Sequence, residues 1–507
     1  MTQTASHTTG PPPVPERLQP RRLGSLPTQV RLPAYEREAH GVGIAHIGIG
    51  AFHRAHQAVY VDDVLAREGG DWRIVGVSCR SGAVRDQLRP QESLYTLLEL
   101  DDGAPQRRII GSIADVLVAP TEPQAVHAVL SLPTTHIISL TISEKGYCHD
   151  PATGRLDAEH PDVLHDLAWP DRPRSAIGLV FRALRERQRR SAPAPTLLCC
   201  DNLPHNGATL RRVLLDFAEL MDPALARWID HEVAFPSTMV DRIVPATTPS
   251  DISMAAQALG FEDQGLVKAE PFTQWVIEDR FAGRHPAFEA AGAQLVTDVR
   301  PYEIAKLRLL NGSHSTLAYL GSLAGYAFAH EAVADGDFLE LLRHLMQVEM
   351  SPTLDPLPGF DIAAYQSALL GRFANRGLRH SLSQIAMDGS QKLPQRLLEP
   401  LRQRLQRAQP IEALALAVAG WMRYSTGRDE QNRVYQVDDP LSAKLAAVVA
   451  SSGTDAAALV GGFLSLTEVF GRDLPQQPTF RAALIRHLRS LFERGARDTV
   501  RRFVQRH

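Results

Sequence analysis

The chain has 507 residues, of which 44% are hydrophobic and 22% are charged, and its formal net charge is -3. These values are typical of a soluble globular protein that is large enough to form two domains. Its 54 basic and 57 acidic side chains are spread along the chain, which excludes the basic bias of a protein that binds nucleic acid or a membrane surface. A small molecule is therefore the expected partner. The oligomeric state stays open, with a monomer as one option.

The cysteines and the N-terminal residues indicate the compartment. Four cysteines, Cys79, Cys148, Cys199 and Cys200, are too few for a disulfide framework and fit a reducing cytoplasm. The first residues lack the apolar segment of a signal peptide, and no later stretch has the roughly 18 uncharged apolar residues of a membrane span. Residues 1–28 are rich in proline and are predicted to form a disordered tail.

Short β-prone runs alternate with helical runs in the first part of the chain. The β-prone runs are residues 43–50, 72–78, 108–113, 136–142 and 195–200. Between them, apolar residues recur at helical spacing, as in AHQAVYVDDVLAREGG and AIGLVFRALRERQ. This alternation predicts an α/β domain with a doubly wound parallel sheet over residues 29–295.

The pattern changes near residue 296, after which the β-prone runs vanish. Segments such as FLELLRHLMQVEM, IEALALAVAGWMRY and FRAALIRHLRSLFERGARDTVRRF have helical period. We therefore expect a mainly α-helical second domain over residues 296–507. The cleft between two domains is the usual place for an active site.

The segment Gly48-Ile49-Gly50 lies between a predicted strand and a predicted helix. At such a turn, backbone N–H groups meet the pyrophosphate of a dinucleotide. The third glycine of the usual motif, which allows close contact between helix and sheet, is replaced by His53. A plain turn between strand and helix is therefore an open alternative.

The residues after the second predicted strand bear on the choice of coenzyme. An acidic residue at this place usually binds the ribose diol of NAD, but residues 77–83 contain no carboxylate. Arg80 would be placed to meet the 2′-phosphate of NADP, and a solvated loop arginine is the alternative. The choice between NAD and NADP stays open at this point.

A second polar group lies in the apolar segment EIAKLRLLNGSH (residues 303–314). In an α-helix that begins after Pro301, Lys306, Asn311 and His314 fall at about 0°, 140° and 80°, so they can line one side. Polar side chains in such a stretch cost free energy unless they are hydrogen-bonded or solvated. A catalytic role competes with three alternatives: a surface lysine, a helix cap at Asn311-Gly312 and a core histidine.

A third polar group, CDNLPHNG (residues 200–207), follows a predicted buried strand, where open α/β sheets bind ligands. Helix capping by Asp201 and Asn202 and a turn at residues 205–207 are the alternatives. The pair Cys199-Cys200 lacks metal-ligand spacing, and the chain has no HExxH and no GxSxG motif. A metal-independent site is therefore expected, without a hydrolase nucleophile.

Seven motifs in order resemble the mannitol dehydrogenase family of long-chain polyol dehydrogenases, which includes mannitol 2-dehydrogenase and the hexuronate reductases. The resemblance covers about residues 30–490. The motifs are GIGAFHRAHQAVY (48–60), SLTISEKGYC (139–148), CCDNLPHNG (199–207), FPSTMVDRIVPATT (235–248), EPFTQWVIED (270–279), KLRLLNGSHSTLAYLG (306–321) and QIAMDGSQKLPQRLL (384–398).

The resemblance implies an NAD(P)-dependent oxidoreductase with a Rossmann-type N-terminal domain and a mainly helical C-terminal domain. It implies that Lys306 is the general base, kept neutral by burial, and that it accepts the hydroxyl proton as hydride leaves for the nicotinamide. Asn202 and Asn311 would donate hydrogen bonds to the developing alkoxide. His314 would orient the base or a substrate hydroxyl, and Glu144 or Glu303 would relay the proton.

The remaining expected site residues follow from the same motifs. The expected coenzyme contacts are Gly48, Gly50, Phe52, His53, Arg54 and Arg80. The expected substrate contacts are Asp241, Lys145, Gln384 and Lys392. One branch of the family has an arginine eight residues before the lysine of its DGSxK motif, where this chain has Gln384 before Lys392.

The choice between a polyol and an aldonate as substrate depends on a few residues. The carboxylate of an aldonate needs a basic partner, and Lys145, Lys392 and Arg396 are candidates, although surface or interdomain pairing is their alternative role. The N-terminal motifs favour mannitol. D-mannitol/D-fructose is therefore placed slightly ahead of D-mannonate/D-fructuronate or D-altronate/D-tagaturonate, with NAD as coenzyme and NADP as alternative. A non-catalytic nucleotide-binding protein and a polyol-binding protein are the other classes considered.

Overall fold

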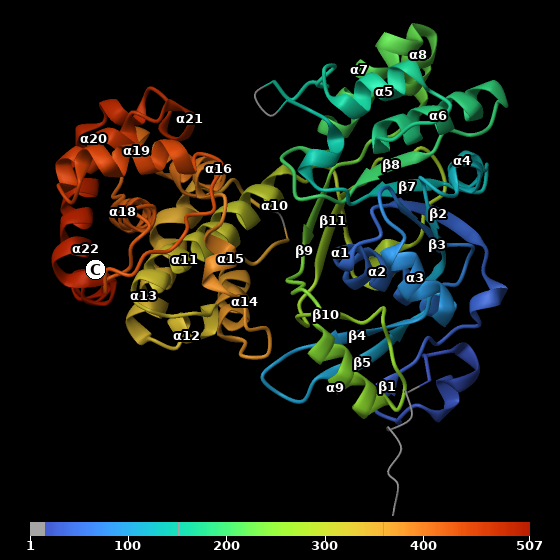
Figure 1. Cartoon of the computed structure of the whole chain (residues 1–507), viewed down its shortest axis with the longest axis horizontal. Helices are drawn as coiled ribbons and strands as arrows, with labels where there is room; N and C mark the ends of the chain where they lie inside the picture. Colours follow the sequence, from blue (N-terminus) through green and yellow to red (C-terminus); the bar gives the residue numbers. More distant parts are fainter. Residues whose placement is uncertain (1–15, 151–152, 358) are drawn as a thin grey trace, which may run out of the picture. The chain divides into compact units, whose positions relative to one another are not determined.

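A computed structural model describes residues 16–150, 153–357 and 359–507 of the chain. Contacts divide the chain into two compact units, Met1–Val299 and Arg300–His507. This division lies four residues after the predicted boundary at residues 295/296. The first unit combines strands and helices, and the second is helical (Figure 1).

The main sheet of the first unit contains five parallel strands in the order β6-β3-β2-β7-β8. They are β2 (Val42–Ile47), β3 (Arg73–Ser78), β6 (Ile113–Val118), β7 (Ile137–Leu140) and β8 (Thr196–Cys199). Numbered along the chain, this order is 3-2-1-4-5, the order of a Rossmann sheet without its sixth strand. A single parallel bridge between Thr196 and Ala234 lies beside β8. The predicted doubly wound sheet is confirmed.

Helices cover both faces of this sheet. Along β2, Ile44 belongs to one core cluster and Ala45 and Ile47 to another, because successive side chains of a strand point to opposite faces. The helices are α1 (Ala51–Ala55), α2 (Gln57–Arg67), α3 (Ala83–Leu88), α4 (Pro123–Ser131), α5 (Pro161–Ala168), α6 (Ala176–Arg189), α7 (Asn206–Met221) and α8 (Pro223–Glu232). Helix α9 (Pro249–Leu259) instead packs in a third core cluster with Leu98 and Ile109. The strands are therefore apolar along almost their whole length, as in parallel sheets buried on both faces.

Two smaller sheets were not predicted from the sequence. One has the order β1-β5-β4-β10 and the other β12-β11-β9. Their strands are β1 (Val30–Arg31), β4 (Tyr95–Glu99), β5 (Gln106–Ile110), β9 (Thr238–Asp241), β10 (Val267–Ala269), β11 (Gln274–Glu278) and β12 (Gln294–Val296). The predicted strand at residues 108–113 is wrong, because it joins the end of β5 to the start of β6, which lie in different sheets.

The predicted disordered tail differs from the structure from residue 16 onward. Leu18 and Leu26 are buried in an apolar cluster, and the Leu18 N–H donates to the carbonyl of Glu262 at 2.9 Å. Apolar residues spaced among the prolines thus find a packing partner that composition alone does not reveal. Residues 1–15 of the predicted tail lie outside the described residues.

The second unit consists of helices and contains no strand among its described residues. The α-helices are α10 (Arg300–Ala305), α11 (Ser313–Leu323), α12 (Ala329–Val333), α13 (Gly336–His344), α14 (Ile362–Ala374), α15 (Leu382–Ala386), α16 (Gly389–Leu393), α17 (Glu399–Gln406), α18 (Glu412–Tyr424), α19 (Ser442–Ser452), α20 (Ala456–Leu464), α21 (Thr467–Phe470) and α22 (Pro478–Val504). The predicted mainly helical domain is confirmed. None of the described helices is both long and apolar enough to cross a membrane.

The centre of the second unit is formed by α11 and α18. Every residue of α18 from Ala413 to Tyr424 is buried, and α18 packs against both α11 and α22. A helix that is apolar on all sides is stable only when its neighbours surround it. These two helices therefore give a rigid support to the polar segment that precedes α11.

Candidate active site

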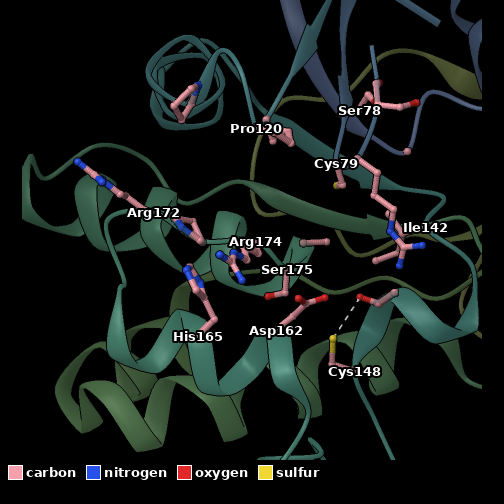
Figure 2. Close-up of a pocket in the computed structure, with 18 of the residues that line it drawn as sticks. Ser78, Cys79, Pro120, Ile142, Cys148, Asp162, His165, Arg172, Arg174 and Ser175 are labelled. Atoms are coloured by element: carbon pink, nitrogen blue, oxygen red, sulfur yellow. Dashed lines mark hydrogen bonds between the residues drawn. The ribbon is translucent and has the colours of Figure 1, made fainter. Parts of the chain in front are cut away.

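A pocket of ≈ 1520 Å³ opens at the carboxyl ends of β2, β3 and β7 in the first unit (Figure 2). Its lining includes Gly48, Gly50 and residues 78–81 and 141–143. Open α/β sheets bind ligands at this edge. The volume exceeds the roughly 300–1,000 Å³ of common small-molecule pockets and suits a larger ligand such as a dinucleotide.

The backbone of the Gly48–Gly50 turn explains why both glycines are needed. Gly48 has a φ of +98°, and a Cβ there would lie 1.9 Å from the carbonyl oxygen of Thr141. At Gly50 a Cβ would meet only the Gly48 carbonyl, at 3.9 Å, so this backbone faces open space. The first glycine thus closes the turn against β7, and the second leaves room for a pyrophosphate. These residues fit a dinucleotide.

Replacing these glycines separately tests this interpretation. Gly48→Ala is expected to destabilise the first unit by about 2–4 kcal/mol, because it adds left-handed strain to a steric clash. Gly50→Ala is the matched control, and it should preserve stability while weakening nucleotide binding. Urea denaturation and titration with NADH measure the two effects. Equal stability of the two variants would contradict this account of Gly48.

A stacked pair of histidines lies beneath the glycine turn. The rings of His46 and His53 are 3.4 Å apart between centroids and 15° from parallel, and both side chains are fully buried. His53 stands at the position of the missing third glycine. Two flat rings in contact therefore bring helix α1 close to β2 without that glycine, and the His53 side chain does not line the pocket.

His46 also connects the turn to β7 through hydrogen bonds. The Thr141 hydroxyl donates to the Gly48 carbonyl at 2.7 Å, so His46 Nε2, 2.8 Å from Thr141 Oγ1, must be the donor in that contact. His46 Nδ1 then accepts from Ser139 Oγ at 2.8 Å. Burial lowers the pKa of His46 to about 3, so the neutral ring that this chain of bonds requires is maintained.

Phe52 and Arg54 also lie away from the lining of the pocket. Arg54 is buried, and its guanidinium donates to the carbonyl of Gly265 at 2.6 Å. Phe52 stacks on His56 at 5.1 Å. The helix predicted after the glycines is interrupted at His56, which has φ -127° and ψ -88° and separates α1 from α2. Arg80, in contrast, is exposed and lines the pocket.

Asp201 organises the polar residues at the ends of β7 and β8. Its carboxylate accepts hydrogen bonds from the N–H groups of Ile142 and Ser143, at 2.8 and 3.0 Å, and from the Tyr147 hydroxyl at 2.7 Å. Burial raises the pKa of Asp201, and these hydrogen bonds oppose the rise. The proposed role of Asp201 as a helix cap is therefore wrong, because this carboxylate fixes the loop after β7.

Three predicted site residues lie on this fixed framework, and a fourth lies on β9 of a smaller sheet. Asn202 directly follows Asp201 and is exposed. Glu144 and Lys145 begin a short 3-10 helix, Glu144–Tyr147, and both are exposed, with Lys145 in the lining of the pocket. Asp241, the last residue of β9, is buried and pairs in register with Gln274 of β11. The first unit thus holds Asn202 and Lys145 at one sheet edge.

In the second unit, the segment Lys306–Gly312 is a π-helix between α10 and α11. The prediction of a regular α-helix is wrong here. In an α-helix Asn311 would be about 140° from Lys306, but the i→i+5 bonding of a π turn places these two residues one turn apart. His314, three residues after Asn311 at the start of α11, continues the same face. Lys306, Asn311 and His314 are 8%, 8% and 7% exposed.

Gly312 explains the tight packing of this turn. It has helical angles, φ -65° and ψ -44°, so the proposed helix cap at Asn311-Gly312 is wrong. A Cβ at Gly312 would lie 2.6 Å from Met350 Cε and 3.0 Å from the Arg396 carbonyl oxygen. Met350 and Arg396 belong to two other π segments, Leu345–Met350 and Pro394–Leu398, which contact the first. Three irregular turns therefore meet around Gly312.

His314 sits in an aromatic pocket. Its ring is 4.5 Å from that of Phe373 and 5.1 Å from that of His380, between centroids. Burial, with further contributions from nearby His380 and Arg372, keeps the pKa of His314 well below its usual value. Its Nε2 has no hydrogen-bond partner among the residues that the structure describes. A neutral imidazole with one unused nitrogen can hold a ligand hydroxyl.

Arg396 contacts the π turn directly. Its guanidinium donates to Ser315 Oγ at 3.1 Å and lies 3.5 Å from the carbonyl oxygen of Asn311. Burial lowers the pKa of Arg396 to about 10, so the group remains charged at neutral pH. Lys392 instead donates to the Met387 carbonyl at 2.5 Å, and Gln384 is exposed on α15. Glu303 lies on α10, one turn before Lys306.

Family models match almost the whole described chain. The mannitol dehydrogenase Rossmann domain matches residues 42–290, and the mannitol dehydrogenase C-terminal domain matches residues 298–492. The chain belongs to the mannitol dehydrogenase family. It is therefore an oxidoreductase of the dehydrogenase type, as the ordered motifs implied.

Several family members are similar over nearly their full length. D-mannonate oxidoreductase of Escherichia coli is 44% identical over 93% of this chain and 97% of its own length. Mannitol 2-dehydrogenase of Phaeosphaeria nodorum is 40% identical, with 96% and 86% covered. The structure of Pseudomonas fluorescens mannitol 2-dehydrogenase with NAD and D-mannitol has a TM-score of 0.86 at 40% identity, covering 97% of this chain and all of that one.

The site of this mannitol dehydrogenase family member shows no cluster of metal ligands. Among residues 16–150, 153–357 and 359–507, no group of three or more His, Cys, Asp and Glu side chains is arranged to hold a metal ion. The polar groups that the structure brings together are instead amide, imidazole, ammonium and guanidinium groups. Such groups can bind a sugar and move a proton.

Proposed function

We propose that this protein is an NAD(P)-dependent dehydrogenase that interconverts a secondary alcohol and a ketone on an acyclic six-carbon sugar, with Lys306 as general base. The observation that carries the proposal is the π turn, which aligns Lys306, Asn311 and His314 on one buried face. Three such groups in an apolar helix are stable only if the surroundings or a ligand satisfy them. NAD is proposed as one coenzyme, as in the similar solved enzyme, and NADP as the other.

Each side chain has a proposed role in the reaction. The bound coenzyme exchanges a hydride with the carbinol carbon. Lys306 takes the proton from the substrate hydroxyl, and Asn311 donates a hydrogen bond to the oxygen as its negative charge develops. Asn202 is proposed as a second amide donor. The neutral His314 holds a neighbouring hydroxyl through its free Nε2, and Glu144 or Glu303 passes the proton to water.

Arg396 favours a substrate that carries a carboxylate. Among the described residues no carboxylate pairs with this half-buried guanidinium, although it lies against the Asn311 carbonyl and Ser315. A half-buried cation without an anionic partner is stabilised by an added anion, and arginine matches a carboxylate with two hydrogen bonds. We therefore propose a hexuronate such as D-fructuronate, reduced to D-mannonate, as the substrate. Similarity to mannitol 2-dehydrogenases keeps D-mannitol/D-fructose as the second candidate.

Initial rates with fructose, fructuronate and tagaturonate test this choice. We expect a uronate to be preferred, and Arg396→Gln to lower the ratio of kcat/KM for uronate over fructose by about 10- to 100-fold, the effect of one lost charge-assisted bond. Arg402→Gln is the matched control, because the Arg402 guanidinium bonds to Asp473 and to the Phe470 carbonyl and not to the residues of the turn. A preference for fructose that Arg396→Gln leaves unchanged would overturn the uronate proposal in favour of mannitol.

A further inference from the structure

We infer that the pocket of the first unit contains a subsite for a 2′-phosphate, formed by Arg80 beside Ser81 after β3, so that the protein binds NADPH at least as well as NADH. This inference rests on the proposed function, because it concerns the coenzyme of that dehydrogenase. Three observations carry it: the absence of a carboxylate after β3, the pairing of the neighbouring arginines, and the placement of Arg80 in the pocket.

The first observation concerns the loop after β3. In Rossmann domains the residue that recognises the adenosine ribose lies at the end of the second strand, and it is an acid when the 2′-hydroxyl is bound. In this chain β3 ends at Ser78, and the pocket lining continues through Cys79, Arg80 and Ser81. The Ser78 hydroxyl donates to the carbonyl of Ser81 at 2.7 Å. This loop therefore offers a guanidinium and a hydroxyl, and no acid that would repel a phosphate.

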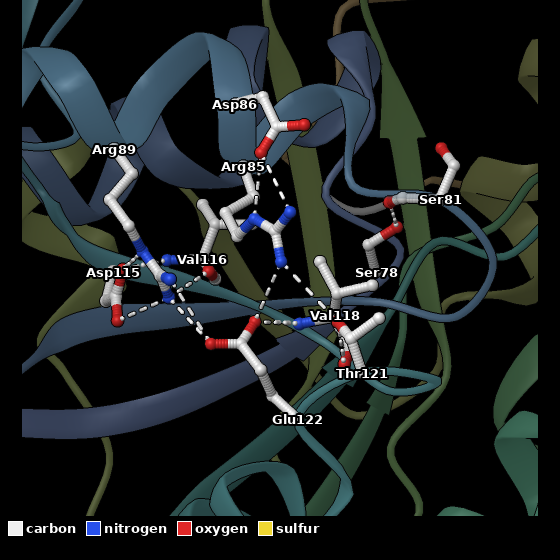
Figure 3. Close-up of polar contacts among 10 residues, drawn as sticks. All are labelled: Ser78, Ser81, Arg85, Asp86, Arg89, Asp115, Val116, Val118, Thr121 and Glu122. Atoms are coloured by element: carbon white, nitrogen blue, oxygen red, sulfur yellow. Dashed lines mark hydrogen bonds and ion pairs between the residues drawn. The ribbon is translucent and has the colours of Figure 1, made fainter.

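The second observation concerns the other charged groups that follow β3 (Figure 3). Arg85 pairs with Asp86 and Glu122, and Arg89 pairs with Asp115 and Glu122, all within 3.4 Å. Glu122 also accepts from the Val118 N–H at 3.0 Å. The two arginines thus pair with all three carboxylates, and none of the three carboxylates is left unpaired to bind a ribose diol.

Arg80 differs from these two arginines. No hydrogen bond or ion pair joins its side chain to any part of the chain that the structure describes. Burial and the carboxylate of Asp162 raise the pKa of the Cys148 thiol to about 11, and the Arg80 guanidinium opposes that rise. Arg80 thus lines the pocket without an ion pair to any carboxylate of the described residues.

The charge of the whole pocket is consistent with a polyanion. The lining contains five arginine and lysine side chains but only two carboxylates. The cations are Arg80, Lys145, Arg172, Arg174 and Arg182, and the acids are Asp162 and Asp171. Asp171 pairs with Arg185 at 2.6 Å. NADP carries a 2′-phosphate in addition to the pyrophosphate, and a phosphate dianion gains most from an unpaired guanidinium.

Asp162 provides the competing interpretation. It lies on α5 across the pocket from the β3 loop, and Figure 2 shows its carboxylate turned toward the hollow. If Asp162 bound the ribose diol, NADH would be preferred and Arg80 would have no effect on the choice. The two interpretations therefore differ in the response to a change at Arg80.

The test compares two nucleotides that differ only in the 2′-phosphate. Calorimetric titration of the full-length protein with adenosine 2′,5′-bisphosphate and with 5′-AMP gives the ratio of their Kd values. We expect the bisphosphate to bind more tightly, and Arg80→Ala to reduce this preference by about 10- to 100-fold. Arg80→Lys should retain part of it. Arg227→Ala, at an exposed arginine of α8 outside the pocket, should retain all of it.

Turnover provides a second readout on the same variants. The ratio of kcat/KM for NADPH over NADH should fall in Arg80→Ala by the same factor as the binding ratio. Equal binding of the two nucleotides by the wild type would overturn the inference, as would a ratio of Kd values that Arg80→Ala leaves unchanged. Neither result would contradict the proposed dehydrogenase function. If neither nucleotide nor NADH binds, the proposed function itself fails.

Discussion

Replacing Lys306 by alanine is expected to lower kcat by about 10²–10⁴, the usual contribution of a general base. The side chain is 8% exposed and begins the π turn that aligns it with Asn311. No other lysine lies on that turn, so removal of this amine leaves no amine on the turn to accept the hydroxyl proton. The loss should appear in kcat, and the Kd for NADH should stay close to the wild-type value.

Two further measurements separate this role from a structural one. Exogenous methylamine should restore part of the activity of Lys306→Ala, because it supplies the missing base to the vacated space. The matched control is Lys444→Ala, which removes an exposed lysine of the second unit that pairs with Glu468. Circular dichroism should show both variants folded. Near wild-type turnover of Lys306→Ala would exclude the lysine as the base.

The main sheet could be predicted because its strands are continuous apolar runs separated by helices. Such runs identify a parallel sheet without any knowledge of its partners. The two smaller sheets could not be predicted in this way, because their strands pair with distant segments. β4, for example, pairs with β5 and with β10, which begins at Val267. Pairing over such distances depends on the tertiary fold, and short strands carry little pattern of their own.

The π turn illustrates why the site was only partly predictable. The spacing of Lys306, Asn311 and His314 suggested a shared side, but α-helical geometry left Asn311 about 140° from the lysine. The turn is widened by packing against two other π segments, made close by Gly312. The carbonyl of Arg396 packs closely against Gly312, although the two residues are far apart in the sequence. Such a contact helps to set the alignment, and sequence pattern does not describe it. The motif proposes the residues, and tertiary contacts arrange them.

His53 is a second case in which sequence reasoning reached a limit. Its presence at the third glycine position weakened the dinucleotide motif, because a side chain there should push helix and sheet apart. The stack with His46 removes this difficulty, since the two rings lie 3.4 Å apart in parallel. The two histidines are seven residues apart in the motif HIGIGAFH, a spacing that has meaning only once the turn between them is known.

The protein is expected to lose stability on mild acidification, by about 4 kcal/mol between pH 7.5 and pH 5 from two histidines alone. Burial lowers the pKa of His46 to about 3 and, together with the Arg372 charge, that of His380 to about 4. In the unfolded chain a histidine titrates near pH 6.5. The unfolded state therefore binds protons as the pH falls below 6.5, while the native state does not, and the free energy of unfolding decreases.

His53 and His314 also decrease the free energy of unfolding as the pH falls, because burial keeps their pKa values well below the usual one. His46 and His53 lie in the first unit, and His314 and His380 in the second. Both units should therefore become less stable together as the pH falls. Urea denaturation followed by circular dichroism at pH 7.5 and pH 5 measures the decrease for each transition.

The His380→Phe variant links this acid sensitivity to a single ring. Phenylalanine keeps the edge contact with His314 and cannot bind a proton, and the His380 Nδ1 that it removes has no hydrogen-bond partner among the described residues. The decrease in the free energy of unfolding should shrink by about 2 kcal/mol in this variant. His231→Gln, at an exposed position of α8, should leave it unchanged. If the free energy of unfolding decreases as much in His380→Phe as in the wild type, His380 does not contribute to the acid sensitivity. Burial would then not suppress protonation of this imidazole in the native protein.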